Sequence, residues 1–301
     1  MNYENLPNNK LPLISVLVPV YNHVDFVTTC LDSIRDNGWT RLELVIIDDG
    51  SKDNSYSIVS SWLEEHKNSF EKVSLETQIN SGVTKTLNRL ISRSSGDFLV
   101  FIASDDYLLE NSIQQRYEYL INNPTKLAVF TDAIGIDDQG KQICSSVIQE
   151  RFHGRVSNLV DEHNIAKELI LNWCVPGPVF MARKETYEEV GFYDEQYFIE
   201  DRYFYLKLLS KGKLGFINKS TAAYRLHAGS STGNKAKQIA VGSEVIKIER
   251  DLLENFSGLN RFYLLLQIWS NYSQVLIASG YMKPLLFLRC LAAKAAKRVA
   301  S

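Results

Sequence analysis

The chain has 301 residues, and its 33 Lys and Arg residues nearly balance its 35 Asp and Glu residues, which leaves a formal net charge of −2. This balance argues against the basic surface of a dedicated nucleic-acid binder and against an acidic disordered tail. With 45% apolar and 23% charged residues, the composition is that of a globular protein with a substantial core.

The cysteines and the first residues indicate a compartment. Cys30, Cys144, Cys174 and Cys290 lie far apart without a CxxC pair, so they predict neither a zinc site nor a disulfide framework. Residues 1–12 are polar, and no stretch reaches the roughly 18 apolar residues of a membrane span. We therefore expect a protein of the reducing cytoplasm.

The first hundred residues alternate between apolar runs and amphipathic stretches. Buried strands are predicted at 13–21, 42–47, 73–76 and 98–103. Helices are predicted between them at 26–34, 55–65 and 84–92. Pro19 is expected to end the first strand. Strands that alternate with helices are typical of right-handed crossovers on a parallel sheet, so the predicted fold class is α/β.

The second half of the chain is less regular. Strands are predicted at 128–136, 179–182, 214–217 and 222–226, and a hairpin turn at 137–140. Helices are predicted at 113–121, 165–171, 184–190 and 200–209. From residue 241 onwards the sequence favours helix throughout.

Two acidic pairs follow predicted strands. Asp48-Asp49 ends the second strand, and Asp105-Asp106 comes directly after the fourth. Such a pair can be turn chemistry or a helix cap. Because the carboxyl ends of parallel strands share one rim, we expect both pairs to lie close together there. Carboxylates beside phosphate oxygens suit Mg²⁺ or Mn²⁺.

Six short motifs together resemble the family 2 glycosyltransferases, which are inverting enzymes of the GT-A fold. They are Val-Pro-Val-Tyr-Asn at 18–22, Asp-Asp-Gly-Ser at 48–51, Asn-Ser-Gly-Val at 80–83 with Asn88, Gly-Asp at 96–97, Ser-Asp-Asp at 104–106 and Glu-Asp at 200–201. The resemblance implies a mostly parallel, Rossmann-like central sheet with flanking helices and a C-terminal helical extension. It also implies a nucleotide-sugar-binding half at 1–110, an acceptor-binding half at 111–235 and the extension at 236–301.

The resemblance implies a donor pocket at the strand ends. Pro19, Tyr21, Asn22 and Asp49 fall where the family holds the base and the ribose of the nucleotide. The segment from Asn80 to Asn88 is expected to line the same pocket.

The Ser104-Asp105-Asp106 segment falls on the DxD-like motif of the family, whose carboxylates bind the ribose and a divalent metal, Mg²⁺ or Mn²⁺. Many members have Asp where this chain has Ala103, so metal binding is expected to rest on Asp105 and Asp106, and either could be the ligand. His227 lies in a segment that resembles Arg-x-His-x-Gly-Ser. It either reaches the diphosphate or its metal, as the resemblance implies, or ties down a loop. Arg225 is either a phosphate partner or part of a structural ion pair.

Asp201 is the general base that the resemblance implies, since the Asp of this pair removes the acceptor hydroxyl proton in similar enzymes. From residue type alone, Glu200 and Asp201 could equally be an acidic first turn favoured by a helix dipole. Glu200 and Trp173 are expected beside the acceptor, although Trp173 could instead be a core residue.

The activity expected is transfer of a hexosyl group from a nucleoside diphosphate-sugar, UDP-linked, to a hydroxyl of a glycan or lipid-linked saccharide acceptor. A nucleotidyltransferase and a non-catalytic nucleotide-sugar binder remain the alternatives. The tail at 281–301 carries five basic residues and no acidic one. It is expected to lie on an anionic membrane at the inner face, or to pack on its own domain or on a second subunit as a homodimer.

Overall fold

The computed structural model describes residues 11–226 and 235–280, so His227 and the basic tail at 281–301 lie outside the described residues. The first part of the chain forms strands β1 (Ile14–Val20), β2 (Leu42–Asp48), β3 (Lys72–Thr77) and β4 (Phe98–Phe101). Between these strands lie helices α1 (Val27–Arg35), α2 (Ser55–His66) with a 3₁₀ turn (Lys67–Ser69), and α3 (Val83–Arg93).

The second part contains shorter and more varied elements. Its strands are β5 (Tyr107–Leu108), β6 (Ala128–Ile136), β7 (Gln142–Cys144), β8 (Met181–Arg183) and β9 (Leu214–Arg225). Its helices are α4 (Ser112–Asn122), α5 (Val156–Leu159), α6 (Ile165–Leu171), α7 (Thr186–Glu189), α8 (Glu200–Ser210), α9 (Lys235–Asp251) and α10 (Gly258–Ala278). A π turn (Val147–Arg151) and two 3₁₀ turns (Gly177–Val179, Leu253–Asn255) complete it.

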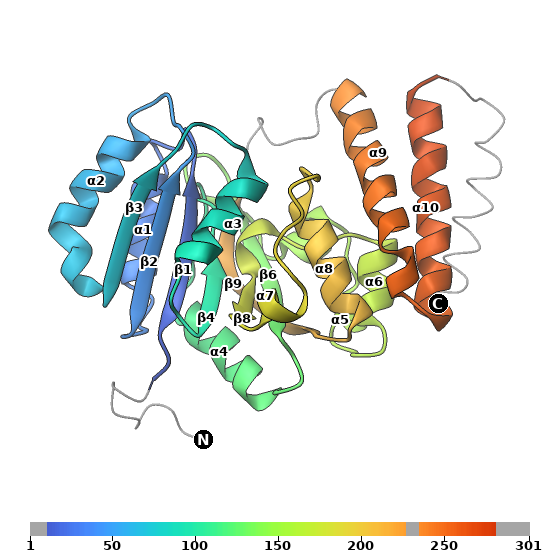
Figure 1. The fold of residues 1–301 in the computed structure, drawn as a ribbon, viewed down its shortest axis with the longest axis horizontal. Helices are drawn as coiled ribbons and strands as arrows, with labels where there is room; N and C mark the ends of the chain where they lie inside the picture. Colours follow the sequence, from blue (N-terminus) through green and yellow to red (C-terminus); the bar gives the residue numbers. More distant parts are fainter. Residues whose placement is uncertain (1–10, 227–234, 281–301) are drawn as a thin grey trace.

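The strands form one nine-stranded sheet with the order β3-β2-β1-β4-β8-β6-β9-β5, and β7 pairs with β6 (Figure 1). The four strands of the first part run parallel to one another, which is the predicted arrangement. The second part is mixed, because β8 is antiparallel to β4 and β6 whereas β9 is parallel to β6. The predicted fold class, α/β with helices around a central sheet, is confirmed.

Two hydrophobic cores lie on opposite faces of the sheet. Val16 and Val18 belong to the core that contains side chains of α1, α2 and α4, whereas Leu17 between them belongs to the core that contains side chains of α3, α6 and α8. This alternation follows from the period-2 geometry of a strand, and it explains why β1 is apolar at nearly every position. Each such side chain contributes about 1.5–3 kcal/mol on full burial.

Pro19 does not end β1, as the sequence had predicted, but lies inside it opposite Ile47 of β2. The physical reason is the side of the strand that it faces. The Leu17 carbonyl accepts a hydrogen bond from the Ile102 N–H, on the side of β1 that faces β4. Backbone groups of successive residues point to opposite sides of a strand, so the backbone nitrogen of Pro19, two residues later, also points towards the β4 side. Pairing with β4 ends at Leu17 opposite Phe101, so the missing N–H of Pro19 leaves no ladder bond unmade.

Two further boundaries differ from prediction. The strands expected at 214–217 and 222–226 are one strand, β9, whose register against β6 shifts around Asp132. The helix expected from residue 241 begins at Lys235 and is interrupted before α10, where Gly258 has a φ of +55°. Gly takes such an angle without the steric cost that most residues meet, so Gly258 favours the interruption locally.

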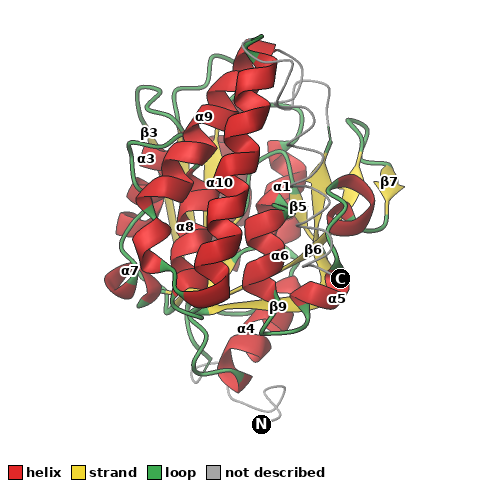
Figure 2. Ribbon diagram, turned by 90° about the vertical axis from the view of Figure 1, so that its right-hand side faces the viewer, coloured by secondary structure: helices red, strands yellow, loops and turns green. Residues whose placement is uncertain are grey.

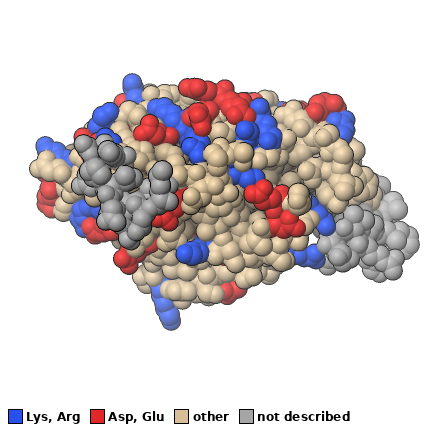
Figure 3. Space-filling view, turned by 90° about the horizontal axis from the view of Figure 1, so that it is seen from below, with Lys and Arg blue, Asp and Glu red and all other residues tan. Residues whose placement is uncertain are grey.

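Helices α9 and α10 lie side by side at the end of the sheet remote from α2 (Figures 1 and 2). No helix in the described part of the chain combines the length and the apolar character needed to cross a membrane. On the face shown in Figure 3, basic and acidic side chains lie interspersed.

Candidate active site

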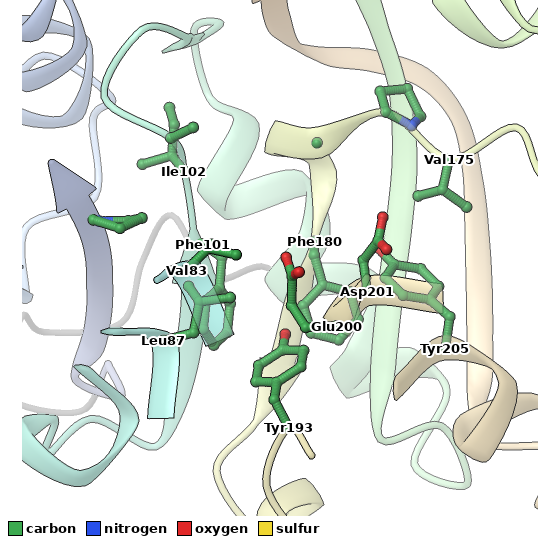
Figure 4. A pocket seen from close by; sticks show the side chains of 14 residues that line it. Val83, Leu87, Phe101, Ile102, Val175, Phe180, Tyr193, Glu200, Asp201 and Tyr205 are labelled. Carbon is green, nitrogen blue, oxygen red and sulfur yellow. The ribbon is translucent and has the colours of Figure 1, made fainter. Parts of the chain in front are cut away.

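A cavity of about 160 Å³ lies where the ends of β1 and β4 meet the beginning of α8 (Figure 4). Most of its lining is apolar, and its acidic groups are Glu200 and Asp201. The lining residues are Pro19, Val83, Leu87, Phe101, Ile102, Ala103, Val175, Pro176, Gly177, Phe180, Tyr193, Glu200, Asp201 and Tyr205. An apolar pocket with a few convergent polar groups at strand ends is the arrangement expected of a ligand site in an α/β protein.

Glu200 and Asp201 form the first turn of α8, and Figure 4 shows both carboxyl groups pointing into the cavity. One Asp201 oxygen accepts the N–H of Arg202 at 2.6 Å. Burial raises the pKa of Asp201 above its ordinary value. Burial, together with the charge of Asp201, raises the pKa of Glu200 to about 8. A pKa of about 8 favours the protonated form of Glu200 at neutral pH.

The pKa of Glu200 predicts a pH-dependent stability. An unfolded Glu loses its proton near pH 4.5, whereas folded Glu200 keeps it to about pH 8, so its contribution to stability falls as pH rises through that window. Glu200→Gln removes the penalty. We expect the variant to have a higher Tm than wild type at pH 8.5, by about 2 °C or more for each kcal/mol recovered, and a difference near zero at pH 4. Thermal melts at both pH values check this, and a pH-independent difference would contradict it.

The two Asp residues of the Asp-Asp-Gly-Ser motif shape the neighbouring loops. Asp48 closes its own turn, with one oxygen accepting the N–H groups of Gly50 at 3.1 Å and of Ser51 at 3.0 Å. Asp49 is buried and accepts the N–H groups of Ser81 at 2.8 Å and Gly82 at 3.0 Å. Asp49, expected at the base and ribose, thus fastens the loop that leads into α3.

Gly50 is required where these loops meet. Its φ is +74°, and a Cβ there would stand 2.9 Å from the Asn80 nitrogen. We expect Gly50→Ala to lower the free energy of unfolding by about 1–3 kcal/mol, since it adds backbone strain and a clash. Gly140→Ala is the matched control, because Gly140 has a φ of +78° with nothing within 4 Å of the added Cβ. Urea titration measures both, and an equal cost for the two would refute the close-approach explanation.

Asp105 and Asp106 differ in their surroundings. Asp106 is buried, accepts the N–H of Arg225 at 2.8 Å, and has a pKa raised by burial and by the charge of Asp105. The Asp105 side chain keeps 14% exposure, and its Oδ1 lies 3.7 Å from Nδ1 of His23. The same nitrogen is 2.8 Å from the Ser104 hydroxyl. The sequence carries no local signal for His23 as a site residue, because 81 residues separate it from Ser104.

Arg225 acts within the fold. Its guanidinium donates to the Asp105 carbonyl at 2.8 Å and to the Asp137 carbonyl at 2.6 Å, and it lies 4.3 Å from the ring centre of Phe26. Arg225 was expected either to bind phosphate or to form a structural ion pair. The contacts support a structural role, but its hydrogen-bond partners are backbone carbonyl groups. The arginine holds the Asp105 loop in place.

Other predicted donor residues lie around the same rim. Pro19 lines the cavity, Tyr21 is 40% exposed, and the Asn22 side chain accepts the Lys52 N–H at 2.7 Å. Asn80 is exposed in the loop beside Gly50.

Two predicted site residues have partners within the fold. Asn88 exchanges hydrogen bonds with the backbone of Tyr193, donating at 2.9 Å and accepting at 3.0 Å. Trp173 is half-buried, with its ring edge-to-face with Tyr205 at 5.5 Å and Arg202 above it at 5.3 Å. Trp173 therefore supports Tyr205, which lines the cavity.

A divalent ion would find few side-chain ligands here. Within residues 11–226 and 235–280, no three His, Cys, Asp or Glu side chains are grouped to hold a metal. Mg²⁺ and Mn²⁺ in nucleotide sites commonly need only one or two carboxylates, since phosphates and water supply the other ligands. The partly exposed Asp105 fits that donor set.

Comparison with known proteins gives the family. Residues 15–191, more than half of the chain, match the sequence model described as Glycosyl transferase family 2. GlyA, a glycosyltransferase of Streptococcus pneumoniae, is 29% identical over 226 residues. The match covers 72% of this chain, which spans only 31% of the length of that protein.

Two solved structures share the fold. A mannosyltransferase from Pyrobaculum calidifontis, in complex with GDP-Man and Mn²⁺, superposes with a TM-score of 0.63 at 17% identity, covering 99% of this chain and 85% of that one. S. aureus TarS in complex with UDP-GlcNAc gives a TM-score of 0.57 at 19% identity, covering 95% of this chain and 89% of that one. The fold is therefore the GT-A fold that the sequence predicted. The chain belongs to glycosyl transferase family 2.

Proposed function

We propose that this chain is an inverting glycosyltransferase that moves a sugar from a nucleoside diphosphate-sugar, UDP-linked, to a hydroxyl of a glycan or lipid-linked saccharide. The observation that carries the proposal is the pair of carboxyl groups, Glu200 and Asp201, in an apolar cavity at the strand ends. Membership of the family supports sugar transfer, and the bound UDP-GlcNAc and GDP-Man of the two structural neighbours support a nucleotide-sugar donor.

Asp201 is the proposed general base. In a single displacement, the acceptor oxygen bonds to the anomeric carbon as the bond from that carbon to the diphosphate breaks, and Asp201 takes the hydroxyl proton. A base with a raised pKa is better matched to this task at neutral pH than an ordinary Asp. Glu200, protonated beside it, leaves Asp201 as the ionised member and keeps a second negative charge out of the cavity.

The donor is proposed to bind along the first half of the chain. Pro19, Tyr21 and Asn22 lie at or just beyond the end of β1. Val83, which follows the loop fastened by Asp49, lines the same cavity as Pro19. Asp105 would hold a Mg²⁺ or Mn²⁺ ion, which when bound stabilises charge on the departing diphosphate. We keep the division into a donor half at 1–110, an acceptor half at 111–235 and an extension at 236–301 as part of this proposal.

A panel of UDP-sugars and GDP-mannose tests the proposal. We expect Mn²⁺ or Mg²⁺ to promote release of the nucleoside diphosphate from at least one donor, by transfer or by slow hydrolysis. A metal-dependent thermal shift without any turnover would favour a non-catalytic binder instead. Formation of pyrophosphate from UTP and a sugar 1-phosphate would favour a nucleotidyltransferase.

A further inference from the structure

Helix α9 contacts the segment that leads into Glu200 and Asp201. Oε1 of Glu244 accepts the backbone N–H of Ile199 at 2.9 Å and also that of Phe198. These two residues immediately precede α8, the helix whose first turn carries the acidic pair. A side chain more than forty residues away in sequence therefore fixes the backbone at the entrance to the candidate catalytic turn.

A second contact lies five residues further along α9. Glu249 is fully buried and forms an ion pair with Arg202, the residue that follows Asp201. Both Glu249 oxygens also accept the side-chain amide of Asn271 on α10, at 3.1 and 3.0 Å. The pair of C-terminal helices thus holds the acidic turn on both of its sides in sequence, before Glu200 and after Asp201.

The same segment is fastened from the opposite direction. The Tyr197 carbonyl accepts the Thr84 hydroxyl at 2.9 Å, while the Tyr197 hydroxyl is hydrogen bonded to Asp251 of α9. Thr84 lies in the first turn of α3, next to Val83, which lines the cavity. Residues 197–202 are therefore held between α3, which carries the loop tied by Asp49, and α9.

We propose that Glu244 is a positioning residue for the transfer reaction, which fixes the direction of Asp201 by anchoring the backbone just before α8. This inference rests on the proposed function of Asp201. The start of α8 needs such an anchor because its N-cap residue is Ile199. This residue has no side-chain oxygen and makes no cap hydrogen bond. The first N–H groups of a helix have no partner within it, so an apolar N-cap leaves this end weakly held unless another element supports it.

Substitutions of Glu244 can distinguish the effect of its side-chain length from the effect of its charge. Both hydrogen bonds end on one Glu244 oxygen, so Gln can keep them with its carbonyl oxygen, whereas Asp keeps the charge and shortens the side chain by one methylene. Displacing a catalytic group by about 1 Å can cost about 10²-fold in rate. We therefore expect Glu244→Gln to retain most of the wild-type kcat, and Glu244→Asp and Glu244→Ala to lose up to about 10²-fold. Because the displaced group acts on the proton in transfer, the KM for the donor should stay close to that of wild type.

The experiment uses the full chain and the UDP-sugar that wild type turns over in the panel, with Mn²⁺, and measures kcat and KM for the three Glu244 variants. Glu254→Ala is the matched control, since Glu254 is an exposed acid after α9 that pairs with Arg261 at 2.7 Å. Its kcat should equal that of wild type. Melting temperatures are recorded alongside, and if Glu244→Ala does not fold, the comparison of Gln with Asp still tests the proposal.

Several results would overturn it. They are an unchanged kcat in Glu244→Asp, equal losses in the Gln and Asp variants, or a loss expressed only in KM. Failure of the proposed function is recognisable separately, because wild type itself would then release no nucleoside diphosphate from any donor. An active wild type with fully active Glu244 variants would refute the positioning role alone.

Discussion

Asp201→Asn is expected to lower turnover by about 10²–10⁴-fold, the range that a positioned general base contributes. Asn has nearly the shape of Asp and can still accept the Arg202 N–H with its carbonyl oxygen, so the turn should be preserved. The variant cannot take up the acceptor proton. Steady-state kinetics with the active UDP-sugar measure the loss, and titration calorimetry with UDP and Mn²⁺ shows whether donor binding is unchanged.

Glu200→Gln is the matched control for this substitution. Its pKa of about 8 keeps Glu200 largely protonated at pH 7, so a neutral amide there resembles the native state. We expect a far smaller loss than in Asp201→Asn. If the two variants lost equal activity, or if Glu200→Gln lost more, the assignment of the base to Asp201 would be wrong.

Asp105→Asn should remove most of the dependence of activity on the divalent metal, and with it about 10²-fold or more in turnover at saturating Mn²⁺, since a bound metal supplies several kcal/mol of charge stabilisation. Asp105 retains 14% side-chain exposure beside His23 and is the acid that we propose to hold the metal. Activity measured against Mn²⁺ concentration, together with the affinity for UDP at each concentration, checks this.

Asp106→Asn distinguishes the role of Asp106 from that of Asp105. Asp106 is buried, and its raised pKa favours the protonated form, which Asn resembles. The Asn oxygen can also accept the Arg225 N–H that Asp106 accepts at 2.8 Å. We expect this variant to keep its response to Mn²⁺. Loss of the metal response in Asp106→Asn and its survival in Asp105→Asn would exchange the two roles.

Much of the framework could be predicted from sequence, because its signals are local. Strands β1, β2 and β4 are nearly continuous apolar runs. Helix α6 (Ile165–Leu171) begins and ends at the predicted residues. Local patterns fail where pairing decides the structure. Strand β5 (Tyr107–Leu108) is too short to carry a period, and its existence depends on pairing with Ala222 and Ala223 of β9.

The candidate site, too, could be predicted from sequence only in part. The motifs pointed to Asp201 and to the Asp105 loop, because residue type and position at a strand or helix end are visible in sequence. Contacts between distant segments were not visible. His23 meets Ser104 across 81 residues, and Ile199 is held by Glu244 across 45. Such contacts follow from the order in which the strands pair and from the docking of α9, which no local pattern specifies.

The configuration of the first-formed product shows whether the sugar is transferred by a single displacement. Incubation of the active α-linked UDP-sugar with the enzyme and metal, followed by proton NMR before mutarotation, reports the anomeric coupling constant of the released or transferred sugar. We expect the β-anomer as the first product, because a single displacement inverts the anomeric configuration. An α-anomer formed first would show retention and contradict the mechanism.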